Sequence, residues 1–294
     1  VIDMQDPWHS EYYRDKPKAE RPKKYWFSYR LNKYLEPIAM NKVDGLISVS
    51  ANYIQILRER YPHLKNKPAR LITFGAFDID FKIAKVHEKE LTLLYKKESN
   101  RINIVYIGRG GYDMKDSVKL LFECFKKGLE FENALFEKVR FHFIGTSYAP
   151  KGKGIETILP IAENMGISEY VHETTDRIGF YACLKNLDSA DGLFIMGSND
   201  VAYTASKLYP YILADRPLLS IFHKESNACE ILKKINSGDI ITIDEALENA
   251  YETVKSYISK IVSKVPTTTK WQAFEKYSAR ELTKEQVHLF NEIV

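Results

Sequence analysis

The chain of 294 residues is long enough for about two domains of roughly 150 residues each. Its 45% hydrophobic and 28% charged residues are ordinary for a globular protein and argue against a fibrous or disordered chain. The 43 Lys and Arg residues exceed the 39 Asp and Glu residues by only four, which argues against nucleic acid as a partner. No apolar run approaches the roughly 18 residues that a membrane-spanning helix needs.

The three cysteines are too few and too widely spaced for a disulfide framework or a Cys-x-x-Cys metal site. The first residues lack the basic and apolar regions of a signal peptide, and they include no initiator methionine. Together these features predict a cytoplasmic protein. Because Val-Ile-Asp-Met looks like a strand from the middle of a domain, we expect the first domain to be incomplete.

Short β-rich apolar runs alternate with segments of helical periodicity, which predicts an α/β fold with parallel sheets. We expect strands at residues 1–4, 45–49, 70–74, 102–107, 139–144, 170–173, 192–196, 217–222 and 240–243. We expect helices at residues 26–40, 52–60, 117–128, 155–165, 179–187, 205–214, 226–234, 245–262, 271–277 and 279–294. The charged stretch 81–101 has no strand pattern and is predicted to be a surface helix and linker.

The basic, aromatic-rich segment 12–34 stands out because its eight cationic residues face only two acidic ones. The cations are Arg14, Lys16, Lys18, Arg21, Lys23, Lys24, Arg30 and Lys33, with Trp26, Phe27 and several tyrosines between them. A solvated loop and helix face is one interpretation. The other is a surface for an acceptor or for anionic lipid headgroups, which would give peripheral membrane contact.

A glycine-rich turn follows the predicted strand 102–107, with the sequence GRGGYDMK from Gly108 to Lys115. The glycines would let backbone amides of Gly110 and Gly111 approach an anion, and Arg109 and Lys115 add positive charge. The turn matches neither the dinucleotide fingerprint nor the P-loop. It is either a plain strand-to-helix turn or a phosphate contact.

A second polar loop joins the predicted strand 192–196 to the following helix. Amides around Tyr203, Thr204 and Ser206, together with the ammonium group of Lys207, could hold a pyrophosphate at the positive end of the helix. Alternatively, Thr204 or Ser206 only caps the helix. Pro210 requires this helix to kink or to begin later than residue 205, because proline clashes within a helix interior.

The sequence SKLYPYILADRPLLSIFHKES of residues 206–226 resembles the donor-site helix and next strand of GT-B glycosyltransferases. In the same order, IDMQDPW, VDGLISVS and FGAFDIDF resemble a strand end of that family's first domain, its later strand and its interdomain linker. Asp78-Ile79-Asp80 is therefore interpreted as linker, and not as a metal-binding DxD motif. The likeness covers nearly the whole chain.

The resemblance implies a GT-B-like fold of two Rossmann-like domains with parallel sheets, of which the N-terminal one is incomplete. Residues 1–97 would form the later part of the acceptor-side domain with the linker, and residues 98–264 the donor domain. Residues 265–294 would be helices that pack back on the first domain.

Site residues follow from the same resemblance, with Arg109, Lys115 and Lys207 as the catalytic cations that neutralise the donor diphosphate. Gly110, Gly111, Tyr203, Thr204 and Ser206 would complete the diphosphate site. Glu173 and Arg177 lie where the family approaches the nucleoside, unless they belong to a surface loop. Pro210 stands where the family carries a ribose-binding Glu, so Glu225 or Glu230 would replace it. Asp6 and His9 would face the acceptor.

The predicted function is transfer of a hexosyl or related group from a nucleoside diphosphate sugar to an unknown glycan, lipid-linked or small-molecule acceptor. Electrostatic catalysis by cations would need no metal and no cofactor. Two alternatives are a non-catalytic nucleotide-sugar-binding module on the same scaffold and a nucleotide-sugar epimerase.

Overall fold

The computed structural model describes residues 1–199 and 205–294, which divide into two compact units. The first unit comprises Val1–Gly75 and Glu275–Val294, and the second comprises Ala76–Phe274. The predicted linker thus belongs to the second unit, where helix α3 (Asp78–Val86) packs on α7 (Phe180–Asp188). Asp78 and Asp80 form the first turn of α3.

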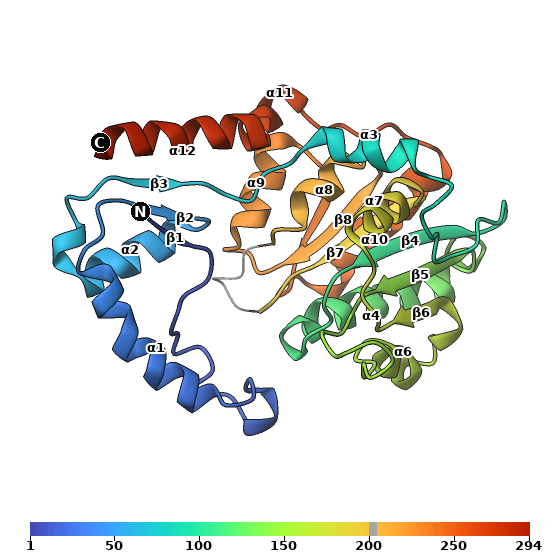
Figure 1. Cartoon of the computed structure of the whole chain (residues 1–294). Coiled ribbons are helices and arrows are strands. Elements are labelled where there is room, and N and C mark those ends of the chain that lie inside the picture. The colour runs from blue at the N-terminus through green and yellow to red at the C-terminus, as the bar shows by residue number, and fades with distance from the viewer. Residues whose placement is uncertain (200–204) are drawn as a thin grey trace. The chain divides into compact units, whose positions relative to one another are not determined.

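The first unit contains a parallel three-stranded sheet in the order β1-β2-β3 (Figure 1). The strands are β1 (Ile2–Met4), β2 (Leu46–Ser48) and β3 (Ala69–Leu71). Helix α2 (Ala51–Arg60) packs on β2, and α12 (Ala279–Ile293) packs on β3. The remaining helices of this unit are α1 (Tyr25–Met40) and the short turns η1 (Lys18–Glu20), η2 (Pro62–Leu64) and η5 (Glu275–Tyr277).

The second unit contains a parallel six-stranded sheet in the order β6-β5-β4-β7-β8-β9. Its strands are β4 (Ile102–Ile107), β5 (Val139–Ile144), β6 (Val171–Thr174), β7 (Gly192–Met196), β8 (Leu218–Phe222) and β9 (Asp239–Thr242). Every residue of β7 and β8 is buried. Strands covered on both faces are expected to be such continuous apolar runs, which explains why the sequence pattern located them.

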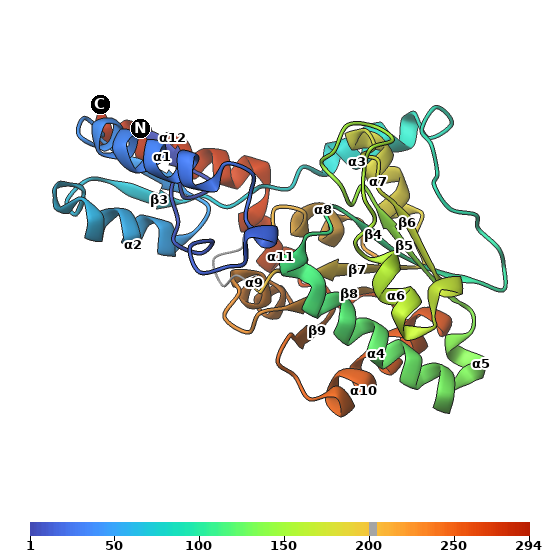
Figure 2. The same cartoon turned by 90° about the horizontal axis from the view of Figure 1, so that it is seen from below.

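Helices cover both faces of the six-stranded sheet. Helix α4 (Lys115–Phe131) packs against α10 (Leu247–Val262) on one face, while α3 and α7 lie on the other (Figure 2). The other helices of this unit are α5 (Asn133–Phe136), α6 (Leu159–Met165), α8 (Leu208–Leu213), α9 (Asn227–Ile235) and α11 (Trp271–Phe274), with the short turns η3 (Tyr112–Met114) and η4 (Ser168–Tyr170).

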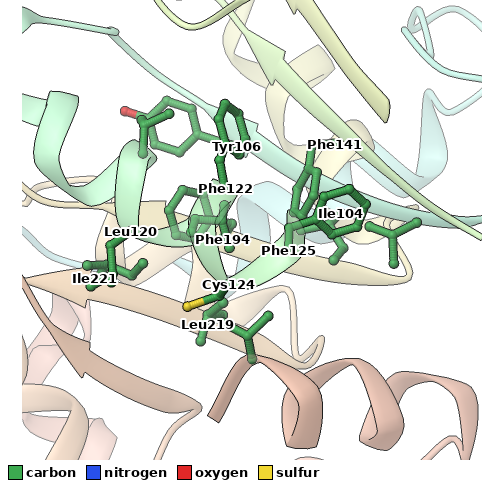
Figure 3. Close-up of a cluster of buried hydrophobic side chains, with 14 of the residues drawn as sticks. Ile104, Tyr106, Leu120, Phe122, Cys124, Phe125, Phe141, Phe194, Leu219 and Ile221 are labelled. Carbon is green, nitrogen blue, oxygen red and sulfur yellow. The ribbon is translucent and has the colours of Figure 1, made fainter. Parts of the chain in front are cut away.

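An aromatic core fixes α4 to the sheet (Figure 3). Phe125 of α4 packs edge-on against Phe141 of β5, with ring centroids 5.0 Å apart, and Phe122 lies in the same layer. Phe122 and Phe125 lie three residues apart on α4 and belong to the buried face of this helix. The rigid core holds the carboxyl end of β4, where the candidate site begins.

Candidate functional site

The strand order of the second unit creates a topological switch point between β4 and β7. From β4 the chain moves outward to β5 and β6, and it then returns to the other side of β4 to form β7, β8 and β9. In sheets of this kind, ligands bind beyond the carboxyl ends of the strands at the switch point. The two polar loops predicted from the sequence follow β4 and β7, so both begin at this position.

Arg109, in the loop after β4, is held in a fixed orientation. Its guanidinium group donates two hydrogen bonds of 2.8 Å to the carboxylate of Asp113, and its carbonyl oxygen accepts one of 2.7 Å from the hydroxyl of Tyr106. Burial alone would raise the pKa of Asp113, but the hydrogen bonds and charge of Arg109 and a hydrogen bond from Ser198 outweigh it and lower that pKa. The carboxylate therefore stays ionised and positions Arg109.

Lys207 is the second cation of the site. Its Nζ donates a 2.5 Å hydrogen bond to the Tyr106 hydroxyl and lies 4.5 Å from the centroid of that ring. Burial, with the positive charges of Arg109 and Arg177, lowers the pKa of Lys207 to about 7, although Asp113 acts in the opposite direction. A Cβ atom at Gly108 would lie 2.2 Å from Lys207 Nζ, so a larger residue there would displace the ammonium group from its present position.

Arg177 follows β6 and contributes the third cation. Its guanidinium group lies 4.6 Å from the ring centroid of Tyr148, and its charge acts on Lys207. The positive charges of Arg109 and Arg177 therefore both repel that of Lys207. Perturbed pKa values at such a position are typical of functional sites, and an anion would relieve the repulsion.

Helix α8 positions Lys207 differently from the sequence prediction. The helix begins at Leu208, three residues after residue 205, which is the later start that Pro210 was expected to require. This later start places Pro210 in the first turn, where proline is tolerated. The Tyr211 hydroxyl then accepts a 2.6 Å hydrogen bond from the amide of Ile107 and donates to its carbonyl oxygen at 3.2 Å, which ties α8 to the end of β4.

The predicted diphosphate residues are only partly brought together. Tyr203 and Thr204 lie outside the described residues, and Ser206 is an exposed residue before α8. The amide of Gly110 donates a 2.8 Å hydrogen bond to the carbonyl of Thr146, so its predicted use as a phosphate donor is not supported.

Lys115 and Gly111 line a cavity of about 630 Å³ beside α4 and α6, together with Gly110 and with Met196 at the end of β7. Lys115 is exposed at the first position of α4 and is not among the charges that act on Lys207. Its role as a diphosphate cation stays a prediction.

Glu173, predicted near the nucleoside, organises the loops after β5 and before α6. Its carboxylate accepts hydrogen bonds from the Thr146 hydroxyl at 2.6 Å and from the amides of Ile158 and Leu159 at 2.9 and 2.7 Å. The carboxylate oxygens are thus already engaged in holding the chain. Glu225 is exposed after β8, just before the N-cap residue Ser226 of α9. The nucleoside contacts of both acids stay predictions.

In the first unit, Asp6 is exposed after β1 while His9 is buried. The His9 imidazole Nε2 lies 3.2 Å from Glu36 Oε1 and 2.8 Å from an Arg60 nitrogen. Burial lowers the pKa of His9, and Arg60 adds to this effect while Glu36 opposes it. The imidazole is thus engaged inside the first unit, and a contact of Asp6 or His9 with an acceptor stays a prediction.

Sequence reasoning did not identify Tyr106, Asp113 or Ser198 as parts of the site. The four-residue spacing of Arg109 and Asp113 across a turn was the available signal for their pairing. Within residues 1–199 and 205–294, no group of three or more His, Cys, Asp or Glu could hold a metal ion. None of the helices in this described part is long and apolar enough to cross a membrane.

Comparisons of the sequence with protein-family profiles and with curated proteins find no match. Solved structures do match. One match is a mutant of S. aureus TarM in complex with fondaparinux, α-GlcNAc-glycerol and UDP. Its sequence is 14% identical to this chain, and the TM-score is 0.57. The match covers 98% of this chain and 50% of the TarM chain.

Two further solved structures match this fold. A glycosyltransferase from Rickettsia africae is 14% identical with a TM-score of 0.58, over 89% of this chain and 66% of that one. A UDP-forming α,α-trehalose-phosphate synthase from Burkholderia xenovorans is 10% identical with a TM-score of 0.59, over 93% and 66%. The chain therefore spans between half and two thirds of these proteins.

The fold resembles that of GT-B glycosyltransferases, which confirms the predicted fold class of parallel Rossmann-like sheets. Identities of this size carry no information about substrates. What the chain binds must be argued from its own residues.

Proposed function

We propose that this chain forms the donor-binding part of a glycosyltransferase, which uses a nucleoside diphosphate sugar. The observation that carries the proposal is that Arg109 and Lys207 follow β4 and β7 at the topological switch point, where the charge of Arg177, after β6, also acts on Lys207. A diphosphate is an anion of suitable charge for three cations that lie close enough to influence one another. The fold likeness to glycosyltransferases supports the same function independently.

The chemistry assigned to the cluster is stabilisation of the leaving group. Transfer breaks the bond between the anomeric carbon and a phosphate oxygen, and negative charge grows on the departing diphosphate. Arg109, oriented by Asp113, and the ammonium group of Lys207 would meet that charge with little rearrangement, as electrostatic catalysis requires. In this proposal the side-chain cations replace a metal ion.

Uridine is the first base to test, because TarM was solved with UDP and the Burkholderia synthase is UDP-forming. We assign Arg177 to the junction between the diphosphate and the nucleoside, since it follows β6 and its charge also reaches Lys207. Glu225 is retained as a candidate for the ribose. The acceptor is a glycan, a lipid-linked sugar or a small molecule, and Asp6 is the candidate contact on that side.

The test is product analysis after incubation with UDP-, GDP- and ADP-sugars, with and without a mixture of candidate acceptors. Release of a nucleoside diphosphate that depends on acceptor supports transfer. Conversion of the donor without acceptor identifies an epimerase, and binding without any product identifies a non-catalytic module. Absence of binding to every nucleotide sugar at millimolar concentration would refute the donor site itself.

A further inference from the structure

Another cavity of the second unit, of about 730 Å³, lies on the face of β4, β5 and β6 that is turned away from α4. Phe141 of β5 packs against α4, so the next residue, His142, points to the opposite face and lines this cavity. The segment 93–96 forms part of the wall. Arg101, immediately before β4, and Arg140, near the start of β5, also line it, so the cavity reaches the amino ends of these strands. The candidate donor site begins at the carboxyl ends, and none of its three cations lines this cavity.

Three stacked aromatic rings form one side of the cavity. The ring centroids of Tyr95 and His142 are 4.9 Å apart with an angle of 30° between the planes, and those of His142 and His172 are 5.2 Å apart at 17°. His142 and His172 are partners in the pairing of β5 with the edge strand β6. Tyr95 is buried whereas His172 is exposed. The stack therefore begins in the protein interior and ends in a ring that a ligand can reach.

Hydrogen bonds hold the inner two rings of the stack in place. The side-chain amide nitrogen of Asn103 donates to the Asp191 carboxylate at 3.2 Å, so its carbonyl oxygen is free to accept from His142 Nε2 at 2.9 Å. The Tyr95 hydroxyl donates to the carbonyl oxygen of Asn186 at 2.6 Å. Because these rings are fixed before any ligand arrives, a stacking ligand would not have to order them.

Positive charge lies beside the stack. Arg101, Arg140 and the exposed Lys96 line the same cavity. The guanidinium group of Arg101 pairs with Glu98 at 2.8 Å, whereas that of Arg140 donates to two backbone carbonyl oxygens. Burial and the charge of Arg101 lower the pKa of Arg140, and partial burial with the charges of both arginines lowers the pKa of His172. An anion in the cavity would relieve this repulsion.

We propose that this cavity, termed here the histidine-stack cavity, binds a nucleoside monophosphate, with the base stacked on His172 and the phosphate bound by Arg140 and Arg101. Aromatic rings are platforms for bases of any kind, and guanidinium groups match the geometry of phosphate. The volume is typical of a site for a small molecule. A phosphate without a base would leave the ring platform unused. The inference does not depend on the proposed transferase activity, because it uses other residues.

The experiment is calorimetric titration of the chain with AMP, because a purine offers the larger stacking surface. Adenosine and inorganic phosphate are titrated separately. Each should bind about tenfold more weakly than AMP or less well still, because each makes only one of the two kinds of contact. The titration is repeated with Lys207→Met, which should bind AMP as the unchanged chain does. Failure of the donor site and failure of the histidine-stack cavity are therefore distinguishable.

Matched variants test the two contacts one at a time. His172→Ala should weaken AMP binding by about tenfold, whereas His172→Phe, which keeps an aromatic ring, should retain most of the affinity. Arg140→Gln should also cost about tenfold, and Arg140→Lys, which keeps the charge, should cost less. The controls His288→Ala and Arg280→Gln remove an exposed histidine and an exposed arginine from α12 and should leave AMP binding unchanged. Circular dichroism checks that each variant is folded.

Four results would overturn the inference. The first is absence of AMP binding at millimolar concentration. Equal affinity for AMP and inorganic phosphate would remove the role of the ring stack. Unchanged AMP binding in both His172→Ala and Arg140→Gln would place the nucleotide elsewhere on the chain. Loss of AMP binding in Lys207→Met would place it at the donor site.

Discussion

The depressed pKa of Lys207 makes a quantitative prediction about donor binding. With a pKa of about 7, Lys207 is roughly 90% charged at pH about 6 and about 1% charged at pH about 9. If binding requires the charged form, the affinity for a nucleotide sugar falls about 90-fold across this range, or about 2.7 kcal/mol. The diphosphate of a nucleotide sugar stays ionised throughout.

The assay is isothermal titration calorimetry with UDP-glucose between pH about 6 and about 9. A bound diphosphate raises the pKa of Lys207, so binding at pH about 8 should take up about 0.9 proton. Calorimetry in buffers of different ionisation enthalpy measures that number. The variant Lys207→Met should lose about 10- to 100-fold in affinity at pH about 6, as expected for a hydrogen bond to a charged group, and its remaining binding should not depend on pH.

The control for this prediction is Lys255→Met on α10, which removes a surface ion pair with Glu132. Its affinity and pH profile should equal those of the unchanged chain. The reasoning is refuted if the unchanged chain binds UDP-glucose with an affinity that is constant from pH about 6 to about 9. It is also refuted if Lys207→Met retains the full pH dependence.

Three further predictions concern the scaffold around the site. Tyr211→Phe removes the hydroxyl that joins α8 to Ile107 and should cost about 1–2 kcal/mol of unfolding free energy in urea melts, with weaker donor binding. Burial lowers the pKa of His142 to about 3, so the neutral imidazole stabilises the fold above pH about 6.5 and this stabilisation is lost as the pH falls. In urea melts, the free energy of unfolding should fall by about 1.4 kcal/mol per pH unit below pH about 6. The variant His142→Gln should make this dependence on pH smaller. Phe125→Ala should cost about 3–5 kcal/mol in the same assay because it leaves a cavity against Phe141, and a loss below about 1 kcal/mol would contradict the packing described.

The strands were accessible to sequence reasoning because burial leaves a local pattern, whereas their order in the two sheets came from the structure. Each of the nine predicted strands has a counterpart, and the bounds of β4, β5 and β7 agree to the residue. The fully buried runs of β7 and β8 are short, apolar and rich in β-formers, so they were recognisable without any knowledge of their neighbours.

Side-chain partnerships were not accessible in the same way, because they depend on residues far apart in the chain. Lys207 was identified as a cation, but its burial against Tyr106, 101 residues away, arises only from the fold. Glu173 was predicted near the nucleoside, although its carboxylate holds the amides before α6. His9 follows a strand end, as expected, but turns inward to Glu36.

The most direct test of the central claim is a crystal structure of the chain with a bound UDP-sugar. The account predicts that the diphosphate lies beyond the carboxyl ends of β4 and β7, with phosphate oxygens within hydrogen-bond distance of Lys207 Nζ and the Arg109 guanidinium group. A nucleotide bound elsewhere on the second unit, with both of these cations out of contact, would contradict it.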